Sequence, residues 1–130
     1  MEKLSYEQQV LALVNQERAK QGLSALSWSD ELTAVARAHS KDMAARGFFS
    51  HTNPDGQSPF DRMKAAGISY RTAGENIAAG QRTPQEVVNA WMNSEGHRAN
   101  ILNASYTRLG VGYASGSGAY STYWTQCFAG

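Results

Sequence analysis

The hydrophobic periodicity changes in the C-terminal part of the chain, and this change restricts the possible folds more than any other feature. Leu109, Val111 and Tyr113 alternate with Arg108, Gly110 and Gly112, which is the two-residue period of a β-strand. Residues 120–128 form a second segment rich in aromatic and β-branched side chains. Because residues 115–118 read as a turn, the two segments predict a β-hairpin.

The earlier part of the chain shows a helical period instead. Apolar residues recur there at spacings of three and four, and hydroxyl residues precede three of the four predicted helices as caps. The sequence therefore predicts an α+β fold with about four helices on a small antiparallel sheet. The predicted helices cover 6–22, 29–47, 58–67 and 83 to a break at 93–96, with a further turn at 97–102 and an extended segment at 75–78.

Size and charge exclude several classes of protein. With 130 residues, the chain fits a single domain, 1–130. It has 12 basic and 11 acidic side chains without a basic cluster, so we expect no nucleic-acid partner. No stretch has the ~18 apolar residues of a membrane span, and the N-terminus lacks the apolar core of a signal peptide. The chain is then either cytosolic or the mature region of a longer precursor.

The single cysteine and one histidine are expected to be structural. Cys127 has no partner for an intrachain disulfide, and strand alternation places it on one face with Tyr123 and Thr125. A buried, inert thiol is therefore expected there. His39 lies on the apolar face of the predicted 29–47 helix, which favours a core histidine hydrogen-bonded to a neighbour.

The other two histidines are candidates for chemistry. His51 lies in a loop, just before the turn signal Asn53-Pro54-Asp55-Gly56. There it either serves a function or holds the loop in place through a hydrogen bond. His97 follows the predicted helix break and either serves a function or caps a helix. Glu75 is an isolated acid in a segment poor in charge, and Glu95 can approach His97 only if the helix breaks at Gly96.

Four motifs follow one another along the chain: Phe49-Ser50-His51-Thr52-Asn53-Pro54-Asp55-Gly56, Gly74-Glu75-Asn76-Ile77-Ala78, residues 91–102 and Tyr123-Trp124-Thr125-Gln126. In this order they resemble the CAP superfamily of cysteine-rich secretory proteins, antigen 5 and plant pathogenesis-related proteins. The resemblance is greatest to its bacterial branch without disulfides, the SCP domain, and extends from about Leu11 to the C-terminus. It implies a three-layer α-β-α sandwich whose cleft holds two histidines and two acids.

The resemblance also assigns site residues. His51 matches the first histidine of the family and Glu75 the acid of its Gly-Glu-Asn motif. The second histidine of the eukaryotic pattern falls on Tyr123, and we take His97 as its bacterial substitute. The second acid falls on Ser94, so Glu95, which follows it, is the candidate.

These residues support two functional hypotheses. Members of the resembled family are mostly exported, which implies a secreted, extracellular or cell-surface location. The first hypothesis is a binding or effector module whose cleft takes zinc or another divalent cation through His51 and His97, or an apolar ligand. The alternative is a hydrolase in which His51 acts as a general base oriented by Glu75, or in which the histidines hold a metal that activates water.

The natural partner is expected to be a lipid, a peptide or a cell-envelope component. An apolar ligand would need an apolar lining near His51. Four side chains around this loop could supply it or could simply pack the third helix: Phe48, Phe49, Phe60 and Met63.

Overall fold

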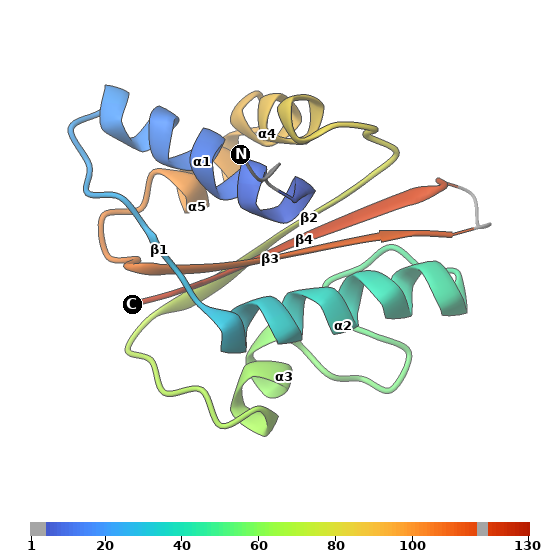
Figure 1. Cartoon of the computed structure of the whole chain (residues 1–130). Coiled ribbons are helices and arrows are strands. Elements are labelled where there is room, and N and C mark those ends of the chain that lie inside the picture. The colour runs from blue at the N-terminus through green and yellow to red at the C-terminus, as the bar shows by residue number, and fades with distance from the viewer. Residues whose placement is uncertain (1–4, 117–119) are drawn as a thin grey trace.

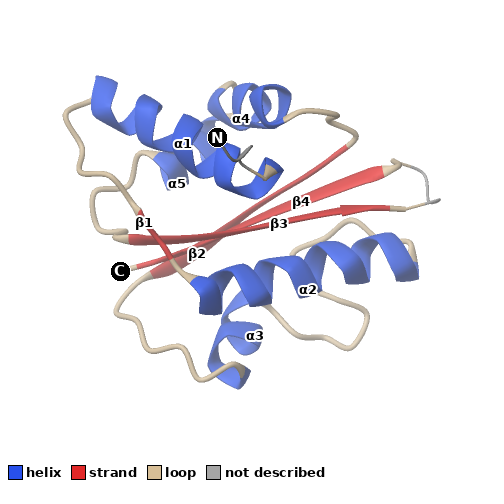
Figure 2. Ribbon diagram, viewed as in Figure 1, coloured by secondary structure: helices blue, strands red, loops and turns tan. Residues whose placement is uncertain are grey.

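The computed structural model describes residues 5–116 and 120–130, and these form a three-layer α+β sandwich, as expected. One helical layer lies on each face of a central sheet (Figures 1 and 2). Residues 117 and 118 of the predicted turn lie outside the described residues. The first layer contains α1 (Tyr6–Lys20), α4 (Pro84–Met92) and α5 (Glu95–Ile101), and the second contains α2 (Asp30–Arg46) and α3 (Pro59–Ala65).

The four described strands have the order β1-β3-β4-β2. The predicted hairpin is confirmed: β3 (Arg108–Ser115) pairs antiparallel with β4 (Thr122–Ala129). The predicted extended segment is β2 (Ala73–Ala79), which pairs antiparallel with the other side of β4 and leaves its own outer side at the edge of the sheet. The periodicity did not indicate β1 (Ser27–Trp28), parallel to β3, because two residues are too few to show alternation.

Glycines in β3 allow α2 to pack directly on the sheet. A Cβ atom at Gly110 would collide with the main chain of Leu32, and one at Gly112 with that of Ala36. The alternation that marks β3 in the sequence therefore has two roles. The large residues, such as Leu109 and Val111, enter the core beneath α1 and α4, and the glycines admit α2 on the other face.

Two charged side chains of α1 are buried, which differs from the buried face that the apolar spacing predicts for this helix. The sequence period places Leu13 and Glu17 on that face, but the structure buries Glu7 and Arg18 more deeply. Burial is possible because both are fully paired. Glu7 binds Arg37 and accepts the Tyr113 N–H at 3.0 Å. Arg18 donates to four carbonyl groups at the end of α5 and in the loops that follow α1 and α5: those of Ser24, Ile101, Asn103 and Tyr106.

Trp91 joins α4 to both the core and the edge strand, and its replacement should be costly. Its ring is buried with Trp124 and Phe128, and its Nε1 donates to the Ile77 carbonyl at 3.1 Å. We expect Trp91→Ala to lower the free energy of unfolding by about 3–5 kcal/mol. Trp91→Phe should cost less, about 1–3 kcal/mol, because it keeps a ring and leaves mainly the Ile77 carbonyl unpaired. Urea denaturation measures both, and a midpoint unchanged in Trp91→Ala would contradict this assignment.

Candidate functional site

The loop between α2 and α3 holds His51 in a defined position. The left-handed Gly47 ends α2, and the buried Asn53 then organises a turn by accepting the N–H groups of Asp55 and Gln57 at 3.1 and 2.9 Å. The carbonyl of Ser50 is bound by Nε2 of His39 at 2.8 Å. The loop therefore presents His51, whose side chain is 48% exposed, from a backbone held on both sides.

Glu75 is the buried centre of the site. Its side chain is 1% exposed, and its two carboxylate oxygens have different partners. Oε1 binds Nδ1 of His51 at 2.8 Å, and Oε2 binds Nη2 of Arg62 at 2.8 Å. Because the carboxylate accepts, Nδ1 of His51 carries the proton in the neutral ring, and Nε2 keeps its lone pair.

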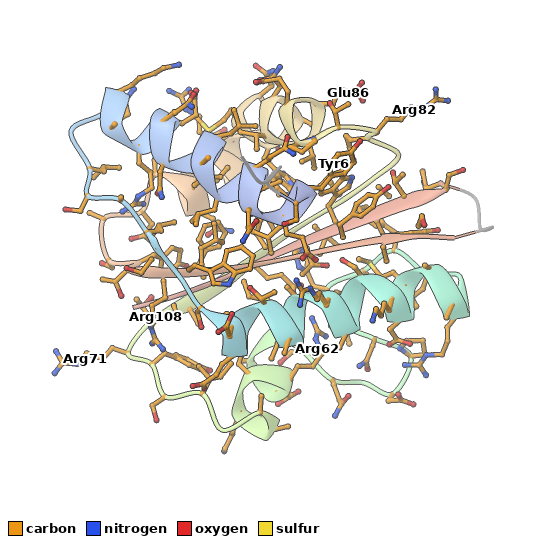
Figure 3. The ribbon with its side chains drawn as sticks, viewed as in Figure 1. Tyr6, Arg62, Arg71, Arg82, Glu86 and Arg108 are labelled. Carbon is orange, nitrogen blue, oxygen red and sulfur yellow. The ribbon has the colours of Figure 1, made fainter. Side chains whose placement is uncertain are left out.

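Arg62 connects the loop to the strand, and sequence reasoning missed it. Its Nη1 donates to the carbonyls of His51 and Gln57 at 2.8 and 3.0 Å, while Nη2 binds Glu75. Figure 3 shows Arg62 next to α3, beneath α2. A signal was present: an isolated acid in a buried strand needs a cation, and the predicted 58–67 helix supplies basic side chains.

Side chains from the other layer cover the outer edge of β2 and bring His97 to it. Asn100 donates to the Glu75 carbonyl at 3.3 Å and to Oδ1 of Asn76 at 2.8 Å. Asn76 in turn donates to the His97 carbonyl at 3.0 Å and to Gln126 at 3.1 Å. These amides attach α5 to the edge strand, so His97 approaches the same edge as His51 from the opposite helical layer.

His97 mirrors His51 in its hydrogen bonding. Its Nδ1 lies 2.8 Å from the hydroxyl of Ser94, which is the N-cap residue of α5 but does not cap the helix backbone with its side chain. Burial lowers the pKa of His97, and the charge of His51 lowers it further. Within the described residues, Nε2 of neither ring has a hydrogen bond. The site thus offers two ring nitrogens without partners, one from each layer.

The remaining candidates lie away from this pair. Glu95 is exposed in the first turn of α5, where it has no hydrogen bond or ion pair in the described part of the chain, and it faces a depression that Arg98 also lines. Tyr123 is buried against Met43 and Ile77. It pairs with Ala79, about 13 Å along the strand from Glu75.

Cys127 and His39 are both buried, as predicted. Burial raises the pKa of the Cys127 thiol, and the Glu75 carboxylate, 3.9 Å away, raises it further, so the thiol stays protonated. Of the four apolar side chains near the His51 loop, Met63 is in the core and Phe48 is half-buried, whereas Phe49 and Phe60 are exposed.

As metal ligands, His51 and His97 form an incomplete set that leaves coordination positions open. Residues 5–116 and 120–130 contain no group of three or more histidine, cysteine or acidic side chains arranged to hold a metal ion. Two imidazoles can still ligate a divalent ion if water completes its coordination, and the His51–Glu75 pair has the arrangement of an oriented base.

Removing Arg62 should destabilise the fold because it leaves the Glu75 carboxylate buried without its cation. For Arg62→Met we expect a loss of about 3–5 kcal/mol in the free energy of unfolding. Arg46→Met is the matched control: it removes an exposed arginine that also binds two acidic side chains, and its effect should be much smaller. Equal midpoints for the two variants in urea denaturation would contradict the role of Arg62.

Stability should fall with acidification below the ordinary histidine pKa of 6.5. Burial lowers the pKa of His39, so at pH values between its folded and unfolded pKa the unfolded chain binds the proton more readily. The loss therefore begins as the pH drops through 6.5 and ends below the folded pKa. His97 acts in the same direction. Urea midpoints of His39→Gln should depend less on pH than those of the wild type, and identical slopes would refute this.

Comparison with known proteins identifies the family. The model of the cysteine-rich secretory protein family, CAP, matches residues 11–128. YkwD of Bacillus subtilis is 57% identical over 127 residues, which are 97% of this chain and 48% of YkwD, so the chain spans about half the length of this relative.

None of the helices in the described ranges is long and apolar enough to cross a membrane.

Solved structures agree with this assignment. An extracellular protein of Bacillus anthracis that contains an SCP domain superposes with a TM-score of 0.86 at 34% identity, over 99% of this chain and 45% of that one. An outer surface protein of Borrelia burgdorferi gives a TM-score of 0.86 at 22% identity, over 98% and 96% of the two chains, and shows the shared fold. The ordered motifs, the sandwich and these matches lead to one conclusion: the chain belongs to the CAP (cysteine-rich secretory protein) family.

Proposed function

We propose that this chain is an exported binding module that takes a divalent cation, zinc foremost, through Nε2 of His51 and Nε2 of His97. The observation that carries the proposal is that the two imidazole rings have the same hydrogen-bonding pattern. In each, Nδ1 is bound by a neighbouring side chain, Glu75 or Ser94, and Nε2 has no partner among residues 5–116 and 120–130. A hydrogen bond at one ring nitrogen is what orients a histidine for ligation through the other.

The donor set suits binding better than catalysis. Two imidazoles suit zinc, copper or nickel better than magnesium or calcium, with water in the remaining positions. A catalytic zinc has three protein ligands as a rule, and this pair supplies two. Glu75 is not free to become a third, because both of its oxygens are already bound by His51 and Arg62. We therefore expect modest affinity and an exposed ion.

Export is supported by a solved structure whose sequence identity to this chain is high enough to indicate more than a shared fold. The Bacillus anthracis protein at 34% identity is described as extracellular. An extracellular module can present a bound cation to a peptide or to a component of the cell envelope. An apolar ligand has less support, because Met63 belongs to the core and Phe49 lies against the ring of Tyr120, with 5.9 Å between centroids.

Calorimetric zinc titration tests the metal. The wild type should bind one ion, and both His51→Ala and His97→Ala should lose most of the affinity. Ser94→Ala should keep a weakened site, because it removes only the partner of Nδ1. Protons compete for imidazole nitrogen, so binding should weaken as the pH falls below about 6.5. The lowered pKa of His97 keeps that ring available to somewhat lower pH than an ordinary histidine.

The matched control for these variants is His39→Gln, which alters a histidine outside the pair and keeps a side-chain N–H donor for the Ser50 carbonyl. Its zinc affinity should equal that of the wild type. Equal binding by the wild type, His51→Ala and His97→Ala, or binding that does not change with pH, would exclude the pair as ligands.

The second candidate function is a hydrolase, favoured by the contact between His51 Nδ1 and Glu75. A carboxylate on Nδ1 stabilises the imidazolium that forms when Nε2 removes a proton from water. Casein and generic esters, each with and without zinc, would then be turned over by the wild type and not by His51→Ala. If the wild type shows no turnover on either substrate class, this alternative fails.

A further inference from the structure

A groove separate from the His51–His97 pair runs between α2 and α3. It has a volume of about 730 Å³, within the range of small-ligand sites. Its floor consists of small apolar side chains from both helices, and the turn after His51 closes one end. The floor residues are Ala34, Val35, Ala38, Ala45, Ala65 and Ala66.

The α2 wall contains a buried hydrogen-bond acceptor without a donor. His39 is 1% exposed, and its Nε2 lies 2.8 Å from the Ser50 carbonyl, which can only accept. Nε2 therefore carries the proton, and Nδ1 is left with a lone pair. Nδ1 has no hydrogen-bond partner in the described residues. Because burial lowers the pKa of His39, the ring is neutral near pH 7 and keeps this lone pair.

The α3 wall contains a buried donor without an acceptor. The side chain of Arg62 is 10% exposed; its Nη1 and Nη2 are used by His51, Gln57 and Glu75, but its Nε–H has no partner among the described residues. Buried polar groups are nearly always paired, so an unpaired acceptor and an unpaired donor among the residues that line one groove are unusual. A group that both accepts and donates a hydrogen bond would satisfy the two atoms.

The rim of the groove favours an uncharged occupant. Arg46 binds both Asp42 and Asp55, at 2.7 and 2.9 Å for Nη2. Lys41 supplies the second positive charge, so the rim carries two positive and two negative side chains and no net charge. The floor adds no charge, and an ion in the groove would lose hydration without a counter-ion.

We propose that the groove between α2 and α3 binds an extended, uncharged peptide segment with small side chains, through one secondary amide held between His39 Nδ1 and Arg62 Nε. A trans amide directs its C=O and its N–H to opposite sides. The carbonyl accepts from Arg62 on α3, the N–H donates to His39 on α2, and the small side chains lie on the alanine floor. Since both protein atoms are shielded from water in this conformation, binding requires a slight outward movement of α3. The site does not depend on the metal pair.

The test is a titration of ¹⁵N-labelled protein with N-acetyl-trialanine amide, followed by NMR. We expect saturable shifts confined to α2, α3 and the turn between them. A second titration uses the analogue in which an ester oxygen replaces the central N–H. It should bind about tenfold more weakly, because it cannot donate to His39.

Two variants and a matched control complete the test. His39→Gln keeps a donor for the Ser50 carbonyl but removes the Nδ1 acceptor, so it should bind the peptide and the ester equally. Ala38→Trp, at an exposed position on the groove, should abolish binding, whereas Ala19→Trp, at an exposed position on α1, should not. The proposal is overturned if the wild type shows no saturable shift, if the ester binds as tightly as the peptide, or if Ala38→Trp binds normally.

Discussion

The buried carboxylate of Glu75 is the constraint on which the site depends. A carboxylate at 1% exposure is stable only if its charge is compensated, and Arg62 and His51 compensate it from two different segments. Satisfying Glu75 therefore attaches α3 and the loop after α2 to the edge strand β2. The same contacts determine which nitrogen of His51 faces outward. The attachment of these segments and the orientation of His51 both depend on the partners of this one carboxylate.

The position of β2 at the edge of the sheet explains why two helical layers meet at one site. An interior strand has neighbours on both sides, whereas among the described strands β2 pairs with β4 alone and leaves carbonyl groups for side chains to bind. Trp91 of α4 and Asn100 of α5 donate to these carbonyls, and both helices are thereby held against the edge. His97 then lies near enough to His51 for the charge of His51 to lower its pKa, although 46 positions separate them in the chain.

Sequence patterns predicted the parts of the fold that depend on local chemistry. Helix caps, glycine stops and the strand alternation after Arg108 depend on neighbouring residues, and the structure confirms them. The patterns failed for β1, which is too short to show a period, and for Glu7 and Arg18, which are buried because distant groups pair with them. Arg62 was missed for the same reason: its partner lies 13 positions away on a strand.

The sequence by itself determined the class of fold, the family and the identity of His51, Glu75 and His97 as the residues of interest, because periodicity and ordered motifs are local properties of the chain. Only the tertiary structure decided how these residues are used. It paired Glu75 with Arg62 and placed Tyr123 in the core and Glu95 on the surface. Within the described residues it left Nε2 of both histidines without a partner, and it brought His39 and Arg62, each with one unpaired polar atom, to the lining of a second groove. The physical reason is that hydrogen bonding and burial depend on which segments meet in space, and no local pattern encodes that encounter.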